Sequence, residues 1–327
     1  MQDKPTPITE HQYNDDAIPM VSISCITYNH EPYIRDAIEG FLMQKTTFPV
    51  EILIHDDAST DKTADIVKEY EKRYPLLLKS IYQTENQYSQ GIKPAKFNRN
   101  RAKGKYYAIC EGDDYWTDPL KLQKQVDFLE KNQDYGFVYT DYQIINQNGD
   151  IIKNYPLLSS MRNNYAHGSV FFQLLSKGNF IPTLTVLFKR NIYENIYEKH
   201  NVIPETKKKH IVDYWVWHHF AIHTKFGFLP EVTAHYRKHP GGATSKTNIK
   251  RHKEKSGQIF YDILCYFDKH RSEKKLSSGE KAVVFRKSLT VLRNRHISAK
   301  QRLKIFQLAL KYFSAKGFFS LISKKLS

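Results

Sequence analysis

The sequence is poor in the residues that build disulfide-stapled or membrane-spanning proteins. Its 327 residues include three cysteines, an odd number, and Cys25 and Cys110 lie inside apolar runs. We therefore interpret the cysteines as reduced core residues. The chain has no apolar run of 18 residues, and its first 19 residues are polar, so it predicts neither a spanning helix nor a secretion signal. We expect a cytoplasmic protein.

Glycine is absent from a position where one class of nucleotide enzymes requires it. The segment Thr27–Pro32, which follows the first predicted strand, contains no glycine. Nucleotidyltransferases carry a glycine-rich loop with Lys or Arg at that point to hold phosphate. The sequence therefore argues against that class.

Acidic residues are scarce in the last quarter of the chain. Residues 240–327 contain 21 Lys and Arg but 5 Asp and Glu, whereas residues 1–239 contain 29 of each kind, so the net charge of +16 lies at the end. The length allows one large core and a smaller appendage. We predict a polar segment at 1–19, a main domain at 20–240 and a basic helical region at 241–327. The basic region indicates a surface that meets an anionic partner.

Apolar strands alternate with helices in the first 110 residues. Strands are predicted at 21–26, 50–54, 78–82 and 106–110, with helices at 33–44 and around 63–70. This alternation favours an α/β fold with a mostly parallel central sheet and helices on both faces. Further strands are expected at 137–142 and 185–188, and a helix and loop over the site within 156–180.

Three carboxylates, Glu111, Asp113 and Asp114, follow the strand at 106–110 within four residues. Adjacent carboxylates repel one another unless one of them is protonated or a cation lies between them. A divalent ion such as Mn²⁺ or Mg²⁺ would convert this repulsion into a site of hard oxygen ligands. The alternative is an acidic turn that caps the helix beginning near Asp118.

A second acidic pair, Asp56 and Asp57, ends the strand at 50–54. The carboxyl ends of neighbouring parallel strands meet at one edge of a sheet, so this pair and the later carboxylates are expected to share that edge. An Asp there could accept a hydrogen bond from the NH or OH of a base or sugar. The alternative is a helix start capped by Ser59 or Thr60.

Four motifs in order resemble the signatures of the family 2 glycosyltransferases. They are Val21–Asn29, which ends in Thr27-Tyr28-Asn29; Glu51–Thr63, which contains Asp-Asp-x-Ser-Thr-Asp-x-Thr; Gly104–Tyr106, which leads into Gly112-Asp113-Asp114; and Glu111–Trp116, which precedes Asp118-Pro119, Lys121-Leu122 and Gln125. The last is similar to bacterial members that build surface polysaccharides. The resemblance covers residues 20–240 and implies a GT-A (Rossmann-like) fold, a nucleoside-diphosphate sugar donor, and inversion at the anomeric carbon. A UDP-sugar is the donor that we expect.

The resemblance also implies roles for the residues of these motifs. Asp57 would bond the nucleobase, and Tyr28 would stack near it. Asp114 would hold Mn²⁺ or Mg²⁺ on the diphosphate, where the ion cancels charge on the leaving group. The remaining motif residues are expected to line the nucleotide-sugar or metal site: Thr27, Asn29, Asp56, Glu111 and Asp113.

An inverting displacement needs a base that takes the proton of the acceptor. Asp213, within Val212–Trp217, resembles the family's Glu/Asp-Asp motif at the start of a helix, although Val212 stands where the first acid is expected. We predict Asp213 as this base. The alternative is a helix N-cap, with Trp215 and Trp217 in the core.

The segment His235–Gly242 contains a further set of candidates. Arg237 can pair with a diphosphate through its planar guanidinium, and His239 can ligate a metal or bond a phosphate oxygen. The segment resembles the flexible stretch that closes over the donor in related enzymes. A basic surface loop is the alternative.

Three histidines, His218, His219 and His223, lie close together in the sequence, the last two at the i,i+4 spacing that zinc sites use. A general-base Glu of the His-Glu-x-x-His kind does not accompany them. We expect them to be structural or to face solvent.

Apolar residues recur at helical spacing in the basic tail, at Leu303, Phe306, Leu310 and Phe313. Such a stripe flanked by lysines can lie in a membrane interface and attract anionic lipid. The resemblance implies lipid-linked acceptors and therefore favours peripheral contact of residues 301–327 with the inner face of the plasma membrane. The helix could equally pack on the body or on another subunit. The tail carries no recognised nucleic-acid motif, so we expect no nucleic-acid partner.

Two hypotheses from different classes follow. The first is an inverting, metal-dependent glycosyltransferase that moves a hexosyl or N-acetylhexosaminyl group to a hydroxyl of a glycan or lipid-linked glycan. The second is a catalytically inactive nucleotide-sugar-binding scaffold whose basic tail binds a membrane or partner. Turnover of a nucleotide sugar would distinguish them.

Overall fold

The computed structural model describes residues 4–13, 18–153, 162, 165–198, 212–242, 246–271 and 275–312. The elements group into two compact units, one built on a β-sheet and one built of helices. Of the predicted helix and loop at 156–180, residues 156–161, 163 and 164 lie outside the described residues. In the described part of the chain, no helix is both long enough and apolar enough to cross a membrane.

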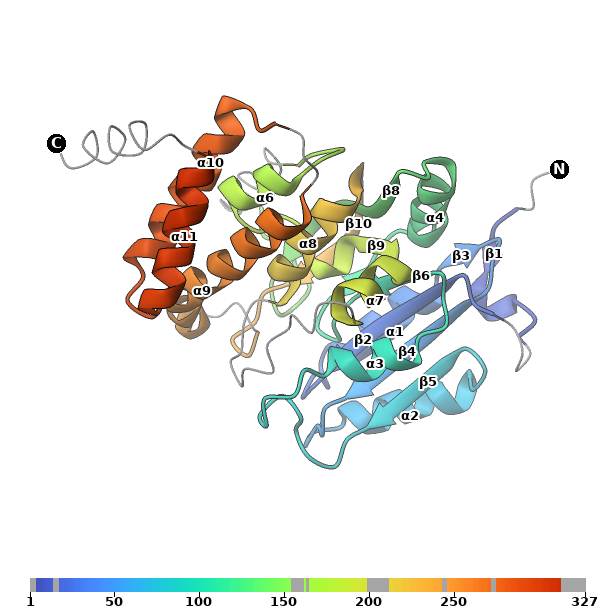
Figure 1. The fold of residues 1–327 in the computed structure, drawn as a ribbon. Coiled ribbons are helices and arrows are strands. Elements are labelled where there is room, and N and C mark those ends of the chain that lie inside the picture. Colours follow the sequence, from blue (N-terminus) through green and yellow to red (C-terminus); the bar gives the residue numbers. More distant parts are fainter. Residues whose placement is uncertain are drawn as a thin grey trace. The chain divides into compact units, whose positions relative to one another are not determined.

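The first unit contains an eight-stranded sheet (Figure 1). In spatial order its strands are β5 (Leu78–Tyr82), β4 (Val50–Asp56), β2 (Val21–Thr27), β6 (Tyr106–Ile109), β9 (Val186–Lys189), β8 (Tyr135–Ile145), β10 (Lys225–Arg237) and β7 (Tyr115–Trp116). The strands predicted in these regions are thus confirmed. β5, β4, β2 and β6 run parallel to one another, so the connections between them are crossovers.

The second half of the sheet is mixed. β9 is antiparallel to both of its neighbours, β6 and β8. β10 is parallel to β8 and antiparallel to β7 at the edge. The sheet is therefore parallel where the first three motif loops leave it and mixed beyond β6.

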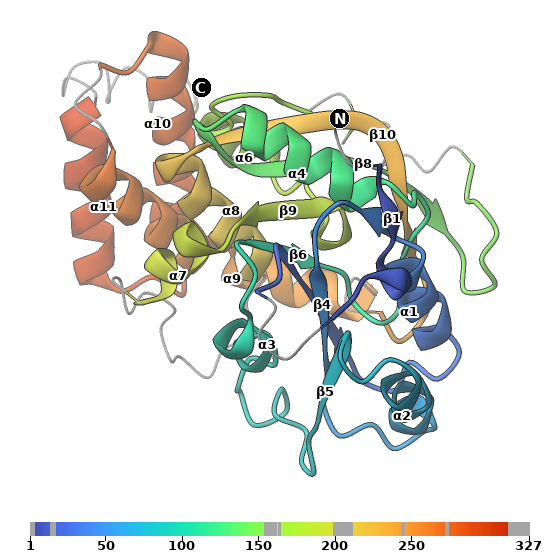
Figure 2. The same ribbon diagram turned by 90° about the vertical axis from the view of Figure 1, so that its right-hand side faces the viewer.

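Helices cover both faces of the parallel strands, as predicted. The first unit contains α1 (Ile34–Leu42), α2 (Thr63–Arg73), α3 (Ala95–Arg101), α4 (Lys121–Lys131) and α7 (Arg190–Glu198). Figure 2 shows α1 and α2 on one side of β4 and β5 and α3 on the other. α1 buries Ile34, Ile38 and Phe41 against the core, at the i, i+4 and i+7 positions of one helix face.

The N-terminal residues described here belong to the same core. β1 (Thr6–Pro7) pairs with β3 (Lys45–Thr46), and between β1 and the first long strand lies η1 (Ile8–Glu10). The side chain of Ile8 is fully buried. Part of the predicted polar segment at 1–19 therefore packs on the sheet unit.

The sequence did not predict β10, the longest strand. Its apolar alternation is interrupted by Pro230 and Glu231, and its pairing with β8 shifts register between Leu229 and Val232 and again before His235. Bulges of this kind break the two-residue period on which strand prediction depends. The segment predicted as a flexible closing loop consequently begins inside a strand, because His235–Arg237 belong to β10.

The second unit consists of α6 (Phe171–Lys177), α8 (Val212–His223), α9 (Lys246–His270), α10 (Ser278–Arg293) and α11 (Ala299–Tyr312). The helical character predicted for the basic region is confirmed, and α6 and α8 join it from the middle of the chain. α10 begins with a capping box in which Ser277 and Glu280 each bond the backbone N–H of the other.

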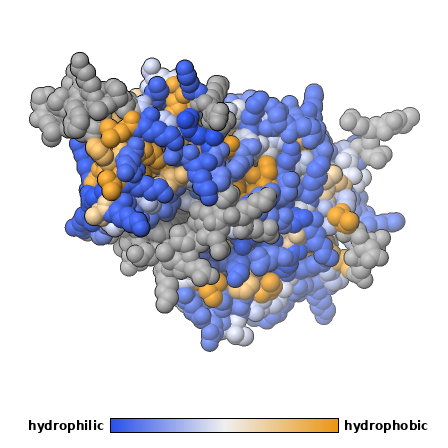
Figure 3. All heavy atoms as spheres, in the orientation of Figure 1, coloured by the Kyte–Doolittle hydropathy of each residue, from blue (hydrophilic) through white to orange (hydrophobic). Residues whose placement is uncertain are grey.

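The apolar stripe of the tail is divided between the inside and the surface. Phe306 and Leu310 pack against a small core of Phe285, Leu289 and Ala309, whereas Leu303 is 59% exposed. In Figure 3, apolar residues are interspersed among hydrophilic ones over the part of the chain that Figure 1 labels α10 and α11. Phe313 lies outside the described residues. Packing within the unit thus accounts for two members of the stripe.

Candidate functional site

The acidic loop that follows β6 lies against the end of β2. The N–H of Gly112 donates to the carbonyl of Ile26 at 3.0 Å, and the N–H of Asp114 donates to the carbonyl of Glu111 at 3.2 Å. A Cβ at position 112 would come within 2.7 Å of Oγ1 of Thr27. Only glycine therefore allows the loop to approach β2 this closely.

Asp114 is the most deeply buried carboxylate of this loop. Its side chain is almost inaccessible, and Oδ1 accepts the backbone N–H of Arg237 at 2.7 Å. Burial raises the pKa of Asp114 well above its ordinary value, and the negative charges of Asp113 and Glu111 raise it further. The same surroundings would favour a bound cation, because a cation relieves this repulsion.

Asp113 lies between two histidines. Nε2 of His239 donates to Oδ2 of Asp113 at 3.0 Å, and Nε2 of His30 lies 3.9 Å from the same oxygen. Burial alone would raise the pKa of Asp113, but the hydrogen bond from His239 and the charge of His30 outweigh it and hold that pKa below its ordinary value. The sequence did not single out His30, although it directly follows the Thr27-Tyr28-Asn29 motif.

Glu111 is held from the mixed half of the sheet. Its Oε2 accepts a hydrogen bond from Oγ1 of Thr183 at 2.7 Å. Thr183 opens η2 (Thr183–Thr185), which precedes β9. A partner 72 residues away in the chain leaves no local signal in the sequence.

Arg237 is buried inside the protein rather than carried on a loop. Its guanidinium donates to Oδ2 of Asp36 at 2.6 Å and to the carbonyls of Asp113 at 3.0 Å and Gln147 at 3.2 Å. It also lies over the ring of Tyr33, 4.8 Å from the centroid. These contacts occupy Nε and both terminal nitrogens, so they favour a bracing role. Its pairing with a diphosphate stays a prediction.

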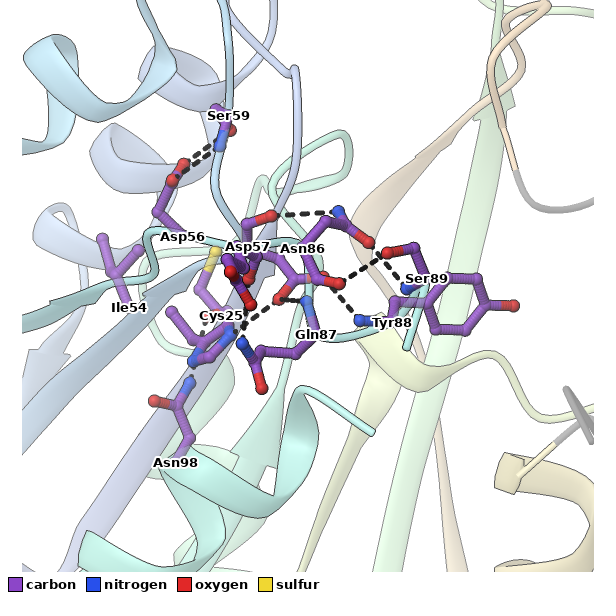
Figure 4. Close-up of polar contacts among 12 residues, drawn as sticks. Cys25, Ile54, Asp56, Asp57, Ser59, Asn86, Gln87, Tyr88, Ser89 and Asn98 are labelled. Atoms are coloured by element: carbon purple, nitrogen blue, oxygen red, sulfur yellow. Dashed lines mark hydrogen bonds and ion pairs between the residues drawn. The ribbon is translucent and has the colours of Figure 1, made fainter. Parts of the chain in front are cut away.

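Asp57 is the buried centre of a hydrogen-bond network (Figure 4). Its Oδ1 accepts the backbone N–H of Gln87 at 3.0 Å, and its Oδ2 accepts that of Tyr88 at 3.1 Å. Nε2 of His55 lies 3.3 Å from Oδ1. The carboxylate thus fixes the turn after β5, and the contact of Asp57 with a nucleobase stays a prediction.

Asp56 fixes the loop after β4 in a similar way. Its two oxygens accept the N–H of Ser59 at 2.9 Å and the hydroxyl of Ser59 at 2.6 Å. Ser59 and Thr60 do not cap α2, as one alternative supposed, because the N-cap residue is Lys62, which makes no side-chain cap bond. Asp56 is therefore a local support of the loop.

The loop after β2 is joined to the loop after β4. Asn29 adopts a left-handed conformation with φ of 53°, and its Oδ1 accepts the N–H of Thr60 at 2.8 Å. Its own N–H donates to Oγ of Ser59 at 2.9 Å. Thr27 is buried at the end of β2, whereas Tyr28 is 43% exposed. Tyr28 is thus the residue of this motif whose ring is open to a ligand.

Asp213 is the one predicted site residue that belongs to the second unit. It lies in the first turn of α8, and Nδ2 of Asn179 donates to its Oδ2 at 2.7 Å. Trp215 and Trp217 are buried on the same helix. All the other predicted site residues belong to the first unit.

The histidines of α8 match the structural interpretation. His218 and His219 are fully buried, and their Nδ1 atoms bond the carbonyls of Tyr214 and Trp215. Nε2 of His223 bonds the hydroxyl of Tyr266 at 2.6 Å. The first two contacts lie within α8, and the third joins α8 to α9.

The residues of the acidic loop fit a metal that takes part of its ligands from elsewhere. Among the residues that the structure describes, no group of three or more His, Cys, Asp or Glu side chains is arranged to hold an ion by itself. The donors at the loop are mainly carboxylate oxygens, which suit Mg²⁺ or Mn²⁺. Such ions keep several waters or bind substrate phosphates, so a few protein oxygens are enough.

The comparison with known protein families gives the class of the protein. Residues 22–197 match the family described as Glycosyl transferase family 2. The match covers more than half of the chain, so the chain belongs to glycosyltransferase family 2. An uncharacterised protein of Mycobacterium tuberculosis is 38% identical over 236 residues, which are 71% of this chain and 63% of that protein. The chain thus matches less than two thirds of the length of this relative.

Solved structures show the same fold. S. aureus TarS 1–349 in complex with UDP matches with a TM-score of 0.56 and 16% identity, over 90% of this chain and 81% of that one. The mannosyltransferase PcManGT of Pyrobaculum calidifontis, in complex with GDP-Man and Mn²⁺, matches with a TM-score of 0.55 and 15% identity, over 98% and 84%. The GT-A fold that the sequence predicted is confirmed.

Proposed function

We propose that this chain is an inverting glycosyltransferase that moves a hexosyl or N-acetylhexosaminyl group from a nucleoside-diphosphate sugar to a hydroxyl of a glycan or lipid-linked glycan. The proposal rests on the cluster of interacting carboxylates that Glu111, Asp113 and Asp114 form on one loop. The chain that carries this cluster belongs to glycosyltransferase family 2. A scaffold that only binds has no chemical need for a cluster of carboxylates that repel one another.

The donor site that we propose lies where the loops after β2, β4 and β6 leave the sheet. A UDP-sugar is our first choice of donor, supported by the UDP complex of TarS, and a GDP-sugar is the second, supported by the GDP-Man complex of PcManGT. Tyr28 would stack on the base, near Asp57. Thr27, Asn29 and Asp56 would shape the pocket wall, since their contacts fix its loops.

The metal that we propose is Mn²⁺ or Mg²⁺, and the Mn²⁺ in the PcManGT complex supports this choice. Asp114 would hold it, with Glu111, Asp113 and His239 around it. When bound, the ion would neutralise charge that develops on the leaving nucleoside diphosphate.

In the proposed reaction, the acceptor hydroxyl attacks the anomeric carbon while the bond to the diphosphate breaks. Asp213 takes the hydroxyl proton, and the diphosphate leaves with the bonding electron pair. The hydrogen bond from Asn179 supports this role, because it orients the carboxylate of Asp213.

The test is transfer or hydrolysis of UDP- and GDP-sugars by the purified chain with Mn²⁺, and again with EDTA. We expect turnover that EDTA abolishes. Binding without turnover for every donor would favour the inactive scaffold instead.

The role of Asp213 has its own test. Asp213→Asn should keep donor affinity and lower turnover by at least about a hundredfold, as loss of a general base does. Asp65→Asn is the matched control, because Asp65 lies in the first turn of α2 and is largely exposed. Near-normal turnover in Asp213→Asn would remove Asp213 from the mechanism.

We also propose that residues 301–327 contact an anionic membrane from the cytoplasmic side. Support comes from the exposed apolar side chain of Leu303 beside the exposed lysines Lys300 and Lys304. The test is flotation with anionic liposomes of the full chain and of Lys300→Glu/Lys304→Glu. Equal flotation of both proteins would contradict this contact.

A further inference from the structure

The backbone of His30 is fixed from two sides. Its N–H donates to Oγ1 of Thr63 at 2.8 Å, and its carbonyl accepts the N–H groups of Tyr33 and Ile34, both at 2.9 Å. These bonds tie the loop after β2 to the start of α1 and to α2. The position of the His30 backbone, from which the side chain extends, is therefore set by the fold.

The ring of His30 points at the carboxylate of Asp113, which His239 approaches as well. The two imidazoles are perpendicular, with centroids 6.2 Å apart and an interplanar angle of 87°. His239 already donates to Oδ2 of Asp113, whereas the 3.9 Å from His30 to that oxygen is too long for a hydrogen bond. His30 is thus close to Asp113 but not bonded to it.

The other nitrogen of His30 does not hold the ring in place. Nδ1 is buried and has no hydrogen-bond partner among the residues that the structure describes. It lies beside Gly112, because a Cβ at that glycine would come within 3.0 Å of it. A buried polar atom without a partner is costly, and such atoms are often found where a ligand completes a site.

We propose that His30 is a positioning residue for Asp113. On binding of the nucleoside diphosphate and its metal, Nε2 of His30 closes the remaining distance and donates to the carboxylate of Asp113, opposite His239. With Oδ2 held by two imidazoles, Oδ1 is left for the metal. This inference rests on the proposed function, since it assigns a residue to the same donor site.

The hydrogen-bond donor of His30 can be separated from its shape. Gln places an amide nitrogen near the position of Nε2, Asn places one near Nδ1, and Leu fills similar space without a donor. His30→Gln should therefore bind nearly as the parent does. His30→Asn and His30→Leu should lose the contact with Asp113.

The experiment is calorimetric titration of the full chain with UDP and with GDP, each with Mn²⁺ and with EDTA. For His30→Leu and His30→Asn we expect the dissociation constant with Mn²⁺ to rise about 10-fold or more, as is typical for the loss of a residue that orients a metal ligand. With EDTA the constants should change much less. His30→Gln should stay within about threefold of the parent, and the exposed His296→Gln serves as the control.

Three outcomes would overturn the inference. In the first, the dissociation constant of His30→Leu with Mn²⁺ stays within about twofold of the parent. In the second, His30→Gln is as weak as His30→Leu, which would make shape rather than the donor responsible. In the third, the loss is equal with Mn²⁺ and with EDTA. If His30→Leu does not fold, as judged by its thermal unfolding without ligand, the comparison of Asn with Gln decides. Failure of the parent to bind either nucleotide with Mn²⁺ would instead contradict the proposed function, and the role of His30 with it.

Discussion

The backbone N–H of Arg237 donates to Oδ1 of Asp114 across 2.7 Å, although the two residues are 123 positions apart in the chain. The same Arg237 bonds the carbonyl of Asp113 through its guanidinium. Together these contacts hold the acidic loop to β10 without using the side-chain oxygens of Asp113. The carboxylates of the loop are therefore kept in place by a neighbouring strand.

These contacts of Arg237 lead to a prediction about stability. Arg237→Gln should lower the free energy of unfolding by about 2–4 kcal/mol, because the buried guanidinium is lost, and with it the donor to the carbonyls of Asp113 and Gln147 and to Asp36. Asp36→Asn should cost at most about 1 kcal/mol, since the Asp36 side chain is 52% exposed and water replaces its partner. Urea denaturation of both variants measures the difference. Equal losses would mean that the bond to Asp36, and not those to the carbonyls, is what matters.

A second prediction concerns the turn after β5. In Asp57→Asn one of the two accepting oxygens becomes an NH₂ group, so either Gln87 or Tyr88 loses the acceptor of its backbone N–H. Leaving such a group without a partner costs about 1–3 kcal/mol, which corresponds to about fivefold to 150-fold faster amide exchange. Hydrogen exchange of these two amides is the measurement.

The amide of Ser59 provides the internal reference for that experiment. It is bonded by Asp56, which the substitution leaves unchanged. Its protection should stay as in the parent. If the amides of Gln87 and Tyr88 also keep their protection, Asp57 does not fix the turn.

The parts of the site that the sequence could predict are those with a local signal. Val21–Thr27 and Val50–Asp56 are buried apolar runs that end in polar loops, so both the strands and the loops could be found. The carboxylates at 111–114 were predicted for the same reason. The contacts that hold the site together join residues far apart in the chain, such as Arg237 and Asp36. The spacing of residues in the sequence does not reveal such contacts.

Arg237 is a case in which the local sequence predicted the wrong environment for a side chain. Its sequence neighbours, Lys238 and two glycines, suggested a mobile basic loop. The side chain at the end of the bulged strand β10 is instead buried, and it pairs with Asp36 of α1. A period of two cannot be recognised across three register shifts, so neither the strand nor the burial could be predicted.

Lys121 gives a prediction about pH. Its side chain is fully buried, with Nζ bonded to Oε1 of Gln125 at 2.7 Å and 4.3 Å from the ring centroid of Trp116. Burial lowers the pKa of Lys121 to about 7, and the nearby groups of Cys110 and Asp118 only partly oppose this. Lysine in an unfolded chain has a pKa of about 10.4.

Between these two pKa values the unfolded chain binds more protons than the folded one. The contribution of this residue to the free energy of unfolding therefore rises with pH through this window, by up to about 1.4 kcal/mol per pH unit. The protein is accordingly least stable, as far as Lys121 is concerned, at the lower end of the window near pH 7. Lys121→Met removes the titration while filling similar space. Urea denaturation at several pH values between about 7.5 and 9.5 should show a slope that is shallower in Lys121→Met than in the parent, with the variant the more stable at the lower end. Parallel profiles would mean that Lys121 keeps an ordinary pKa in the folded protein, so that Gln125 and Trp116 compensate the burial of its charge.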